Sequence, residues 1–259
     1  MNNIHDVSLR ERKFAQTKVS LAWAFRERLR EKRLQDISVK EVCDTLPISE
    51  VTFYKYFTEK TDVLVYLLQL WHYEAVWRLR RWEREKTNLE VIEAWFKFGE
   101  EQLEAYPAAT GEILSFIMKE KGRLKFSEIS VAELLFAYPD LEGIEKIEVP
   151  AEHHDDRCFM LPYLYKAIEH GELPSGTDVE MVADMLDAIF IGSQLTLREK
   201  SPQKARKASS LLLKYLWQGI RSEKANAPAA HNSSSTARRP KMAAAHHIHS
   251  HSGSLIAIQ

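Results

Sequence analysis

The residues best suited to chemistry in this chain lie in one short run, Ser49 to Phe57, with the sequence SEVTFYKYF. Four of its last five residues are aromatic, yet a lysine and two tyrosine hydroxyls stand among them. Helical spacing places Phe53 and Phe57 on one side, where they can enter a core. The remaining hydroxyl and ammonium groups are donors suited to phosphate oxygens and base edges. A short helix with one apolar face and one row of donors is therefore expected here.

A second group of reactive residue types is the run HHDD at residues 153–156, followed by Cys158. These are the types that bind metals, but adjacent residues in a loop rarely converge on one ion. The His-rich stretch at 246–251 could chelate a metal in solution, and we exclude it from the fold. The sequence contains no G-x-S-x-G, P-loop or G-x-G-x-x-G motif. We therefore expect no enzyme, no metal site, no cofactor and no catalytic residue.

The net charge of −1 hides an uneven distribution of charge along the chain. Residues 1–84 carry 16 Lys and Arg against 12 Asp and Glu, residues 85–180 carry 9 against 21, and residues 181–259 carry 11 against 4. A basic N-terminal part suggests contact with a polyanion, although solvated helix faces of chance composition would look the same. No apolar run approaches the roughly 18 residues of a membrane span, and no signal-like segment opens the chain. With two cysteines and no disulfide framework, we expect a cytoplasmic protein that does not contact membranes.

Apolar residues recur at intervals of three and four along most of the chain, which predicts an all-α fold. Only Ile144–Val149 alternates weakly, as a strand would. We expect Ser38 and Ser49 to cap the second and third helices, with Glu41 completing a capping box after Ser38. The predicted helices span residues 9–33, 39–45, 50–56, 60–86, 89–105, 109–120, 131–136, 156–169, 178–199 and 202–221.

The first three predicted helices have the layout of a helix-turn-helix, with the tight corner Leu46-Pro47-Ile48 between the second and third. In that motif the third helix enters the DNA major groove while the second crosses the backbone. Val42, Leu46 and Ile48 are the expected buried partners of the aromatic face. The layout explains why one short helix needs both an apolar face and exposed donors.

The residues that carry this motif are more specific than its layout. In Ile37–Cys43, Ile48-Ser49, Thr52–Phe57 and Lys60–Leu64 the chain resembles the DNA-binding domain of the TetR (tetracycline-repressor) family. The resemblance is close over residues 10–65, with weaker echoes at 167–173 and in the last two helices. It implies a helix-turn-helix DNA-binding domain at 1–65 and a helical effector-binding and dimerisation domain at 66–222 reached by a long helix. The small, polar residues that follow predict a disordered tail at 223–259.

The resemblance also implies DNA contacts at individual positions. The expected contact residues are Arg10, Arg12, Lys13, Ser38, Lys40, Ser49, Glu50, Val51, Thr52, Tyr54, Lys55, Tyr56 and Lys60. Ser49, Glu50, Val51 and Lys55 are expected to approach base edges, and the others to contact phosphates or flank the groove. Lys60 in particular is expected to meet a phosphate near a helix N-terminus.

Two positions depart from the family pattern. The corner usually has glycine where this chain has Pro47, which is compatible with the corner only if its φ suits. The third helix usually begins with a small or basic pair where this chain has Glu50-Val51. Glu50 either accepts a hydrogen bond from a cytosine amine or faces solvent.

The resemblance implies a homodimer held by two C-terminal helices from each subunit. Apolar stripes in the last two predicted helices fit this interface, although they also fit an intramolecular core. The expected interface residues are Leu186, Ile189, Phe190, Ser193, Leu197, Leu211, Leu212, Tyr215 and Leu216. A dimer would place two recognition helices about 34 Å apart, which matches a palindromic operator.

Ligand recognition is less well defined by the sequence, because aromatic residues at helical spacing fit a core as well as a pocket. The candidate pocket residues are Trp71, Trp77, Trp95, Phe98, Phe116, Phe159 and Tyr163. The leading interpretation is a homodimeric repressor that an unidentified small-molecule effector releases from double-stranded DNA. The alternative is a TetR-like architectural DNA-binding factor that acts through a protein partner and has no small-molecule ligand.

Overall fold

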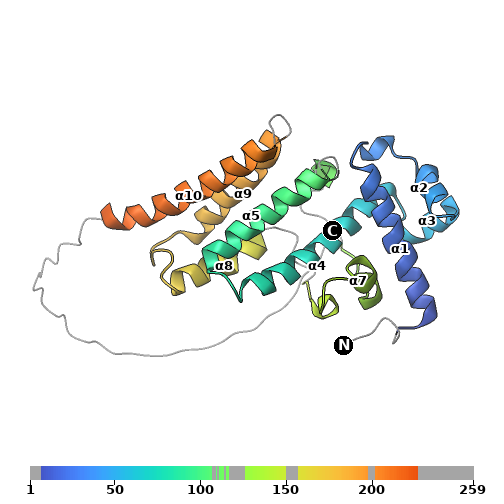
Figure 1. The fold of residues 1–259 in the computed structure, drawn as a ribbon, viewed down its shortest axis with the longest axis horizontal. Coiled ribbons are helices and arrows are strands. Elements are labelled where there is room, and N and C mark those ends of the chain that lie inside the picture. The colour runs from blue at the N-terminus through green and yellow to red at the C-terminus, as the bar shows by residue number, and fades with distance from the viewer. Residues whose placement is uncertain are drawn as a thin grey trace, which may run out of the picture. The chain divides into compact units, whose positions relative to one another are not determined.

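The computed structural model describes residues 7–106, 109, 111–113, 115–116, 126–149, 157–197 and 202–226. Within these ranges the regular elements are helices and no strand is present, so the predicted all-α fold is confirmed. The elements labelled in Figure 1 and the two short 3-10 turns between them are α1 (Leu9–Arg28), η2 (Leu34–Asp36), α2 (Val39–Thr45), α3 (Glu50–Tyr56), α4 (Lys60–Trp82), α5 (Asn88–Ala105), α7 (Val131–Ala137), η3 (Ile144–Lys146), α8 (Arg157–Glu169), α9 (Val179–Leu197) and α10 (Pro202–Asn226).

Two expectations about local structure were wrong. The first helix ends at Arg28 and not at residue 33, and the segment expected to alternate as a weak strand begins with the 3-10 turn η3. Most of the helix predicted at 109–120 lies outside the described residues.

Side-chain caps fix several helix starts. Ser8 and Thr87 form capping boxes with Glu11 and Glu90 at the starts of α1 and α5. Such pairs satisfy two backbone N–H groups that the helix itself leaves without partners. The cap predicted for α3 is confirmed and is described with the site below.

The cap predicted for α2 forms only in part. Ser38 stands at the N-cap position, but its side chain accepts no capping hydrogen bond. Glu41 does not turn back to complete a capping box, because its carboxylate is taken by two basic side chains from the end of α1. Arg28 Nε lies 3.2 Å and Lys32 Nζ 2.8 Å from Glu41 Oε1. These ion pairs tie α1 to α2.

The backbone at the corner between α2 and α3 adopts the conformation of a helix C-terminus that usually contains glycine. Leu46 is the C-cap of α2, and Ile48 N donates to Cys43 O at 3.3 Å, as in a Schellman motif. Pro47 therefore occupies the position where glycine is usual, and its φ is +22°. Proline normally holds φ near −65°, and it has no N–H to form the second hydrogen bond of the motif. The φ of Pro47 therefore does not suit proline, and the backbone of the corner is strained.

The buried side chains form two hydrophobic clusters. The first joins α1, α2, α3 and the first half of α4, and it continues into α7 and η3. The second joins the end of α4 to α5, α8, α9 and α10. Figure 1 shows α4 running from the three N-terminal helices to this second group. The expected domain boundary at residue 65 falls inside α4 and inside the first cluster, so one continuous helix serves both clusters.

The segment around α7 packs on α1, far from it in sequence, through a buried ionic contact. Glu133 Oε1 accepts from Lys18 Nζ at 2.7 Å and from the Tyr66 hydroxyl at 3.0 Å. Its other oxygen accepts from the backbone N–H of Ser130 at 2.9 Å. Burial alone would raise the pKa of Glu133, but the hydrogen bonds and charge of Lys18 together with Ser130 lower it. The carboxylate thus stays charged and joins α1, α4 and α7.

None of the helices in the described ranges combines the length and apolar character of a membrane span. The expected tail at 223–259 lies, from residue 227 onward, outside the described residues.

Candidate nucleic-acid interface and ligand cavity

The helix α3 buries the aromatic face that the sequence predicted. Phe53 is fully buried, with its ring centroid 5.5 Å from that of Phe25 on α1 and 5.6 Å from that of Phe57. Aromatic pairs at these separations add stability beyond the area that they bury. The partners expected from the sequence belong to the same cluster, namely Val42, Leu46 and Ile48. The pose of α3 is therefore set by its contact with α1 and α2.

The opposite face of α3 is open. Val51 and Tyr54 are 69% and 52% exposed, and Glu50 and Lys55 are also exposed. An exposed valine on a seven-residue helix contributes little to the fold, but its methyl groups suit contact with a thymine methyl. The exposed side chains of α3 thus combine an apolar contact, a carboxylate acceptor, a phenol and an ammonium.

The expected hydroxyl donors lie at the two helix starts. Ser49 Oγ accepts from the backbone N–H of Thr52 at 3.2 Å and lies 2.9 Å from the Thr52 hydroxyl, so both side chains are engaged in capping α3. Ser38 and Lys40 are exposed at the start of α2. Lys40 Nζ lies 3.2 Å from Asp44 in an exposed ion pair, which is weak enough to exchange for a phosphate.

The first turns of α1 lie beside α3. The rings of Phe14 and Tyr56 are 4.6 Å apart, which brings the N-terminal half of α1 against α3. Arg10 and Lys13 are exposed there, and Arg12 is half-buried. The contact of this segment with DNA stays a prediction from the resemblance.

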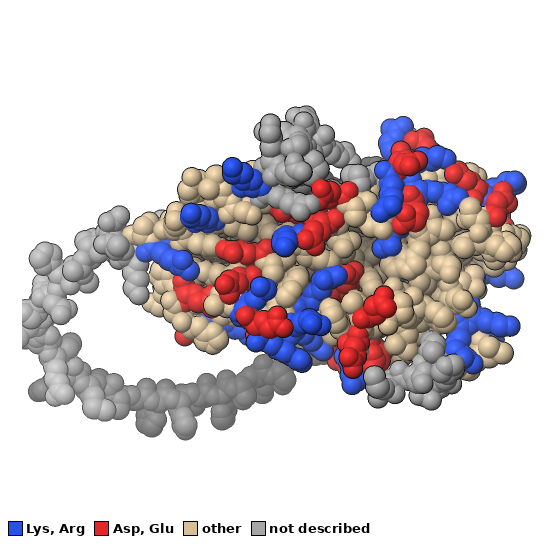
Figure 2. All heavy atoms as spheres, in the orientation of Figure 1, with Lys and Arg blue, Asp and Glu red and all other residues tan. Residues whose placement is uncertain are grey.

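The basic side chains around α1–α3 are largely neutralised by neighbours. On the face seen in Figure 2, Lys and Arg over this end of the molecule are interspersed with Asp and Glu. The internally paired basic residues are Arg28, Arg30, Arg33, Lys32 and Lys40. The positive field available to a polyanion is therefore smaller than the count of Lys and Arg suggests.

Lys60, which was expected to contact phosphate, is engaged inside the protein. Its Nζ donates to Leu34 O and Ile37 O at 2.8 Å and to Gln35 O at 3.3 Å. An ammonium group has three N–H donors, so these three carbonyls use its full capacity. The structure gives Lys60 the role of holding the η2 turn against the start of α4, in place of the phosphate contact expected from the resemblance.

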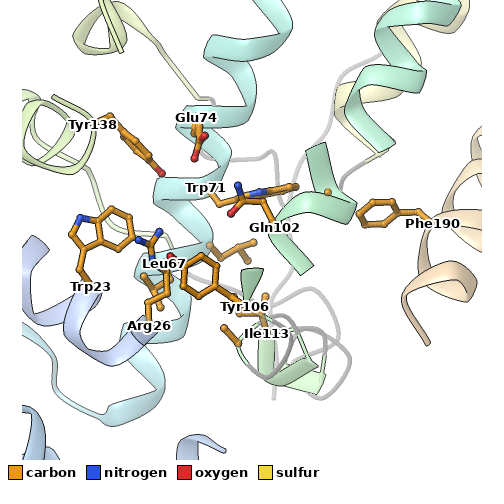
Figure 3. A pocket seen from close by; sticks show the side chains of 13 residues that line it. Trp23, Arg26, Leu67, Trp71, Glu74, Gln102, Tyr106, Ile113, Tyr138 and Phe190 are labelled. Carbon is orange, nitrogen blue, oxygen red and sulfur yellow. The ribbon is translucent and has the colours of Figure 1, made fainter. Parts of the chain in front are cut away.

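A small cavity lies between α1, α4, α5 and the residues after α7 (Figure 3). Its volume is about 120 Å³ and its walls are mainly apolar and aromatic. The residues that line it are Trp23, Arg26, Leu67, Leu68, Trp71, Glu74, Gly99, Gln102, Tyr106, Ala109, Ile113, Tyr138 and Phe190. A larger groove of about 970 Å³ runs along α5 and α10, but it is bordered by charged side chains of both signs.

Of the seven pocket residues expected from the sequence, only Trp71 lines this cavity. Four others, Trp95, Phe98, Phe159 and Tyr163, are core residues of the second cluster. Trp77 donates its indole N–H to Glu142 O at 2.9 Å, and Phe116 borders a separate hollow beside Lys60. The helical spacing of these aromatic residues therefore reports packing more than ligand binding.

The sequence reasoning missed the part of the cavity that α1 supplies. The guanidinium carbon of Arg26 lies 3.9 Å from the ring centroid of Trp23 and 4.4 Å from that of Tyr106. A tryptophan followed three residues later by arginine is a detectable stacking signal, because positions i and i+3 are neighbours on a helix. In the sequence it was read as part of an ordinary amphipathic helix.

On the other side of the cavity, Tyr138 lies next to Glu74 (Figure 3). Burial and the charge of Glu74 raise the pKa of Tyr138 well above its ordinary value, so the phenol is neutral. Glu74 itself is held by Arg78, whose Nη2 and Nε lie 2.6 and 2.9 Å from one carboxylate oxygen. The acidic group of the cavity therefore already has its counter-ion.

Part of the apolar stripe that was expected to form an interface on α9 faces the core of the chain instead. Leu186 and Ser193 are 1% and 7% exposed, and Phe190 packs on Phe96 and against Gly99, so this stripe belongs to the core of the chain itself. Ile189 and Leu216 are partly buried against the same cluster, and the side chain of Leu197 lies outside the described residues. The exposed apolar residues of α9 are Met181, Met185 and Ile191, which the sequence reasoning did not select. On α10, Leu211, Leu212 and Tyr215 are exposed, as a dimer surface requires.

The cluster of metal-ligand types at 153–156 lies outside the described residues, as does the side chain of Cys158. Among the residues that are described, no three His, Cys, Asp or Glu side chains converge as metal ligands would.

Comparison with known proteins gives similarity in structure but not in sequence. No protein-family model and no curated protein sequence matches the chain. A structure from work on the molecular basis for control of antibiotic production by a bacterial hormone superposes with a TM-score of 0.51 at 16% identity, covering 83% of this chain and 98% of that one. This likeness shows a shared fold.

Two further solved structures are more distant. The ketosteroid transcriptional regulator KstR2 of Mycobacterium tuberculosis gives a TM-score of 0.47 at 18% identity, covering 83% of this chain and 96% of its own. A TetR family transcriptional regulator from Chloroflexus aurantiacus gives 0.41 at 13% identity, covering 85% and 97%.

Proposed function

We propose that this chain is a cytoplasmic transcriptional regulator of the TetR family that binds DNA through α3 and has no enzymatic activity. The observation that carries the proposal is the division of α3 into two faces. Its aromatic face is buried on α1 and α2, while Glu50, Val51, Tyr54 and Lys55 remain exposed. A helix of this kind is held rigidly and offers varied contacts to a major groove.

The proposed regulator acts as a homodimer. Exposed Met181 and Met185 on α9, together with Leu211 and Tyr215 on α10, form an apolar surface on two helices that pack against each other. Exposed apolar side chains on neighbouring helices favour burial in a partner. A second copy would produce a four-helix interface and a pair of recognition helices related by two-fold symmetry. The dimer reads a palindromic operator on double-stranded DNA.

We further propose that the regulator is a repressor released by a small molecule. The cavity beside Trp71 is bordered both by α1, which supports the recognition helix, and by α4 and α5. A ligand there contacts the DNA-binding helices and the remaining helices at once, which is the arrangement that a coupling between two sites needs. The identity of the operator and of the regulated genes is not part of the proposal.

The test is selection of binding sites from a random pool of duplex DNA with the full chain, followed by a salt titration on the selected duplex. Recovery of a palindrome, with affinity that falls steeply as salt rises, is the expected result. Val51→Ala and Glu50→Gln should change the preferred bases, whereas Tyr54→Phe should weaken binding to all sequences similarly. Tyr165→Phe on α8 is the matched control, because Tyr165 has the same 52% exposure as Tyr54. Enrichment no greater than that of a random duplex would reject the proposal.

The dimer is tested separately by light scattering after size exclusion. Met185→Asp should convert the dimer to a monomer, and the monomer should lose its preference for a palindrome over a half-site. Glu180→Lys, which changes charge at an exposed position of the same helix, is the control. A monomeric wild-type protein at micromolar concentration would contradict the dimer.

A further inference from the structure

We propose that the cavity between α1 and α4 is a site for a small aromatic carboxylate, with the carboxylate bound by Arg26. This inference rests on the proposed function for its regulatory meaning, but the binding itself can be measured without DNA. The argument has three parts: the unbalanced charge in the cavity, the size and lining of the cavity, and the place of Arg26 on α1.

The charges that line the cavity leave one positive group unbalanced. Glu74 is neutralised by Arg78 within the protein. Arg26 lines the cavity between the rings of Trp23 and Tyr106 and forms no ion pair with an acidic side chain of the described residues. A guanidinium binds a carboxylate through parallel hydrogen bonds. Arg26 is therefore the charged group of this cavity with which a ligand can pair.

The lining of the cavity favours an aromatic body. The rings of Trp23, Trp71, Tyr106 and Tyr138 border it together with the edge of Phe190 (Figure 3). Aromatic rings pack against one another in offset or edge-to-face geometry, and such pairs stabilise beyond simple burial. An aliphatic chain would fill the same space without these contacts.

The volume limits the ligand to a single ring. A cavity of about 150 Å³ lined by apolar side chains holds benzene. This one measures about 120 Å³, so even a single ring requires a small outward movement of the walls. A steroid or a long acyl chain would need the walls to move apart. A one-ring carboxylate places its ring among the aromatic walls and its charged group at Arg26.

The sign of the ligand charge follows from the same geometry. A cationic ring would meet the Arg26 guanidinium without a free carboxylate to offset it, since Glu74 is already paired. A neutral ring would fill the apolar space and leave the Arg26 donor without a partner. An anion is thus favoured over both of these.

Arg26 also connects the site to the DNA-binding helices. It stands on α1 two residues before Arg28, whose Nη2 donates to Glu41 O at 3.1 Å on α2. Phe25, the residue before Arg26, packs on Phe53 of α3. A ligand that binds Arg26 therefore acts on the same helix that positions α2 and α3.

The experiment compares three probes with the same ring and different charge at pH 7: benzoate, benzyl alcohol and benzylamine. Binding to the full chain is measured by calorimetry and by the fluorescence of Trp23 and Trp71, which border the cavity. Benzoate should bind at least about tenfold more tightly than benzyl alcohol, because the Arg26 contact is a charge-assisted bidentate pair. Benzylamine should bind most weakly. Equal affinity for benzoate and benzyl alcohol, or no binding by any probe, would overturn the proposal.

Two variants test whether the binding is at this site. Arg26→Gln should reduce benzoate binding to the level of benzyl alcohol, while Arg80→Gln, at an exposed position of α4 that does not border the cavity, should leave it unchanged. Leu68→Phe adds a ring to the cavity wall and should weaken benzoate and benzyl alcohol together, which keeps the test valid if Arg26→Gln does not fold. Unchanged benzoate binding in both Arg26→Gln and Leu68→Phe would place the anion elsewhere and reject the site.

The two proposals can fail independently. A chain that selects a palindrome from random DNA but does not distinguish benzoate from benzyl alcohol keeps the proposed function and loses this inference. A chain that binds benzoate through Arg26 but selects no DNA keeps the site and loses the proposed function.

Discussion

Lys60 offers the sharpest test of the DNA-binding surface, because the family resemblance and the structure assign it different roles. The resemblance implies a phosphate contact, whereas in the structure the Lys60 ammonium donates to Leu34 O, Gln35 O and Ile37 O. Replacing it with methionine keeps the length of the side chain and removes the donors. The perturbation therefore separates a loss of DNA contact from a loss of local structure.

The magnitude follows from the three hydrogen bonds. A hydrogen bond to a charged group contributes about 1.5–3 kcal/mol when well formed. Two of the three have good lengths of 2.8 Å, and the third, at 3.3 Å, is exposed and contributes little. Because Lys60 is only partly buried, we expect Lys60→Met to lower the free energy of unfolding by about 2–3 kcal/mol in total. This corresponds to a fall in Tm of roughly 5–10 °C for a chain of this size.

The assay pairs thermal unfolding with a salt titration of DNA binding. For Lys60→Met we expect the lower Tm and no change in the slope of log affinity against log salt, measured below the Tm. Lys13→Met is the matched control, since Lys13 is exposed on α1 and is expected to contact phosphate; it should leave Tm unchanged and reduce the slope by about 0.9 per subunit, or about 1.8 for the dimer. A slope that falls by about 1.8 in Lys60→Met, with Tm unchanged, would refute the internal role and restore the phosphate contact.

Three further predictions concern groups that hold the fold. Lys18→Met should lower the free energy of unfolding by about 3–5 kcal/mol, because it leaves the Glu133 carboxylate buried without its cation. Adding Glu133→Gln should restore more than half of this loss. A double variant that is no more stable than Lys18→Met would contradict the ion pair as the cause. Hydrogen bonds from Leu89 and Asn88 lower the pKa of Glu172 although burial alone would raise it, so its contribution is present above the unfolded pKa of about 4.3 and is lost as pH falls through the folded value. Glu172→Gln should therefore lower Tm at pH 7, and this difference should shrink as pH falls below about 4.3, whereas a pH-independent difference would rule out the charged form as the cause. Pro47→Gly should raise Tm, because it relieves about 1–3 kcal/mol of backbone strain in the folded protein. Glycine also increases the conformational entropy of the unfolded chain, but this costs only about 0.4–1 kcal/mol. A lower Tm would mean that the corner is not left-handed in solution.

Helix positions and some of the caps could be predicted from the sequence because they depend on local spacing. Ser49 followed by Thr52, and the apolar period around Phe53, set the start and the buried face of α3 without reference to the rest of the chain. The end of α1 could not be predicted in this way. No glycine or proline follows Arg28, and the charged residues beyond it suit a longer helix, but the chain must turn so that Arg28 and Lys32 both reach Glu41.

The faces of α9 show why an apolar pattern alone does not locate an interface. This helix is apolar on more than one side, so its period is compatible with either orientation. Leu186 and Met185 are neighbours in sequence, yet the first is buried in the core and the second is 43% exposed. Which of the two faces outward depends on where α5, α8 and α10 pack, and that information is not local. The same reason explains why the pocket residues could not be predicted. Trp71 borders the cavity and Trp95 lies in the core, although their spacing along the helices does not distinguish them.

The helix α1 is the element on which the proposed DNA binding and the proposed ligand site depend together. Its inner face carries Phe25, which packs on Phe53 of α3, and its last turn carries Arg28, which pairs with Glu41 of α2. One face of the same helix borders the cavity through Arg26, and Lys18 binds the buried Glu133 of α7. Since protein interiors are densely packed, a rotation or shift of α1 cannot be absorbed at one of these contacts without changing the others. A ligand that fixes Arg26 therefore alters the set of positions open to α2 and α3, and Arg26→Gln should uncouple ligand from DNA even when both still bind.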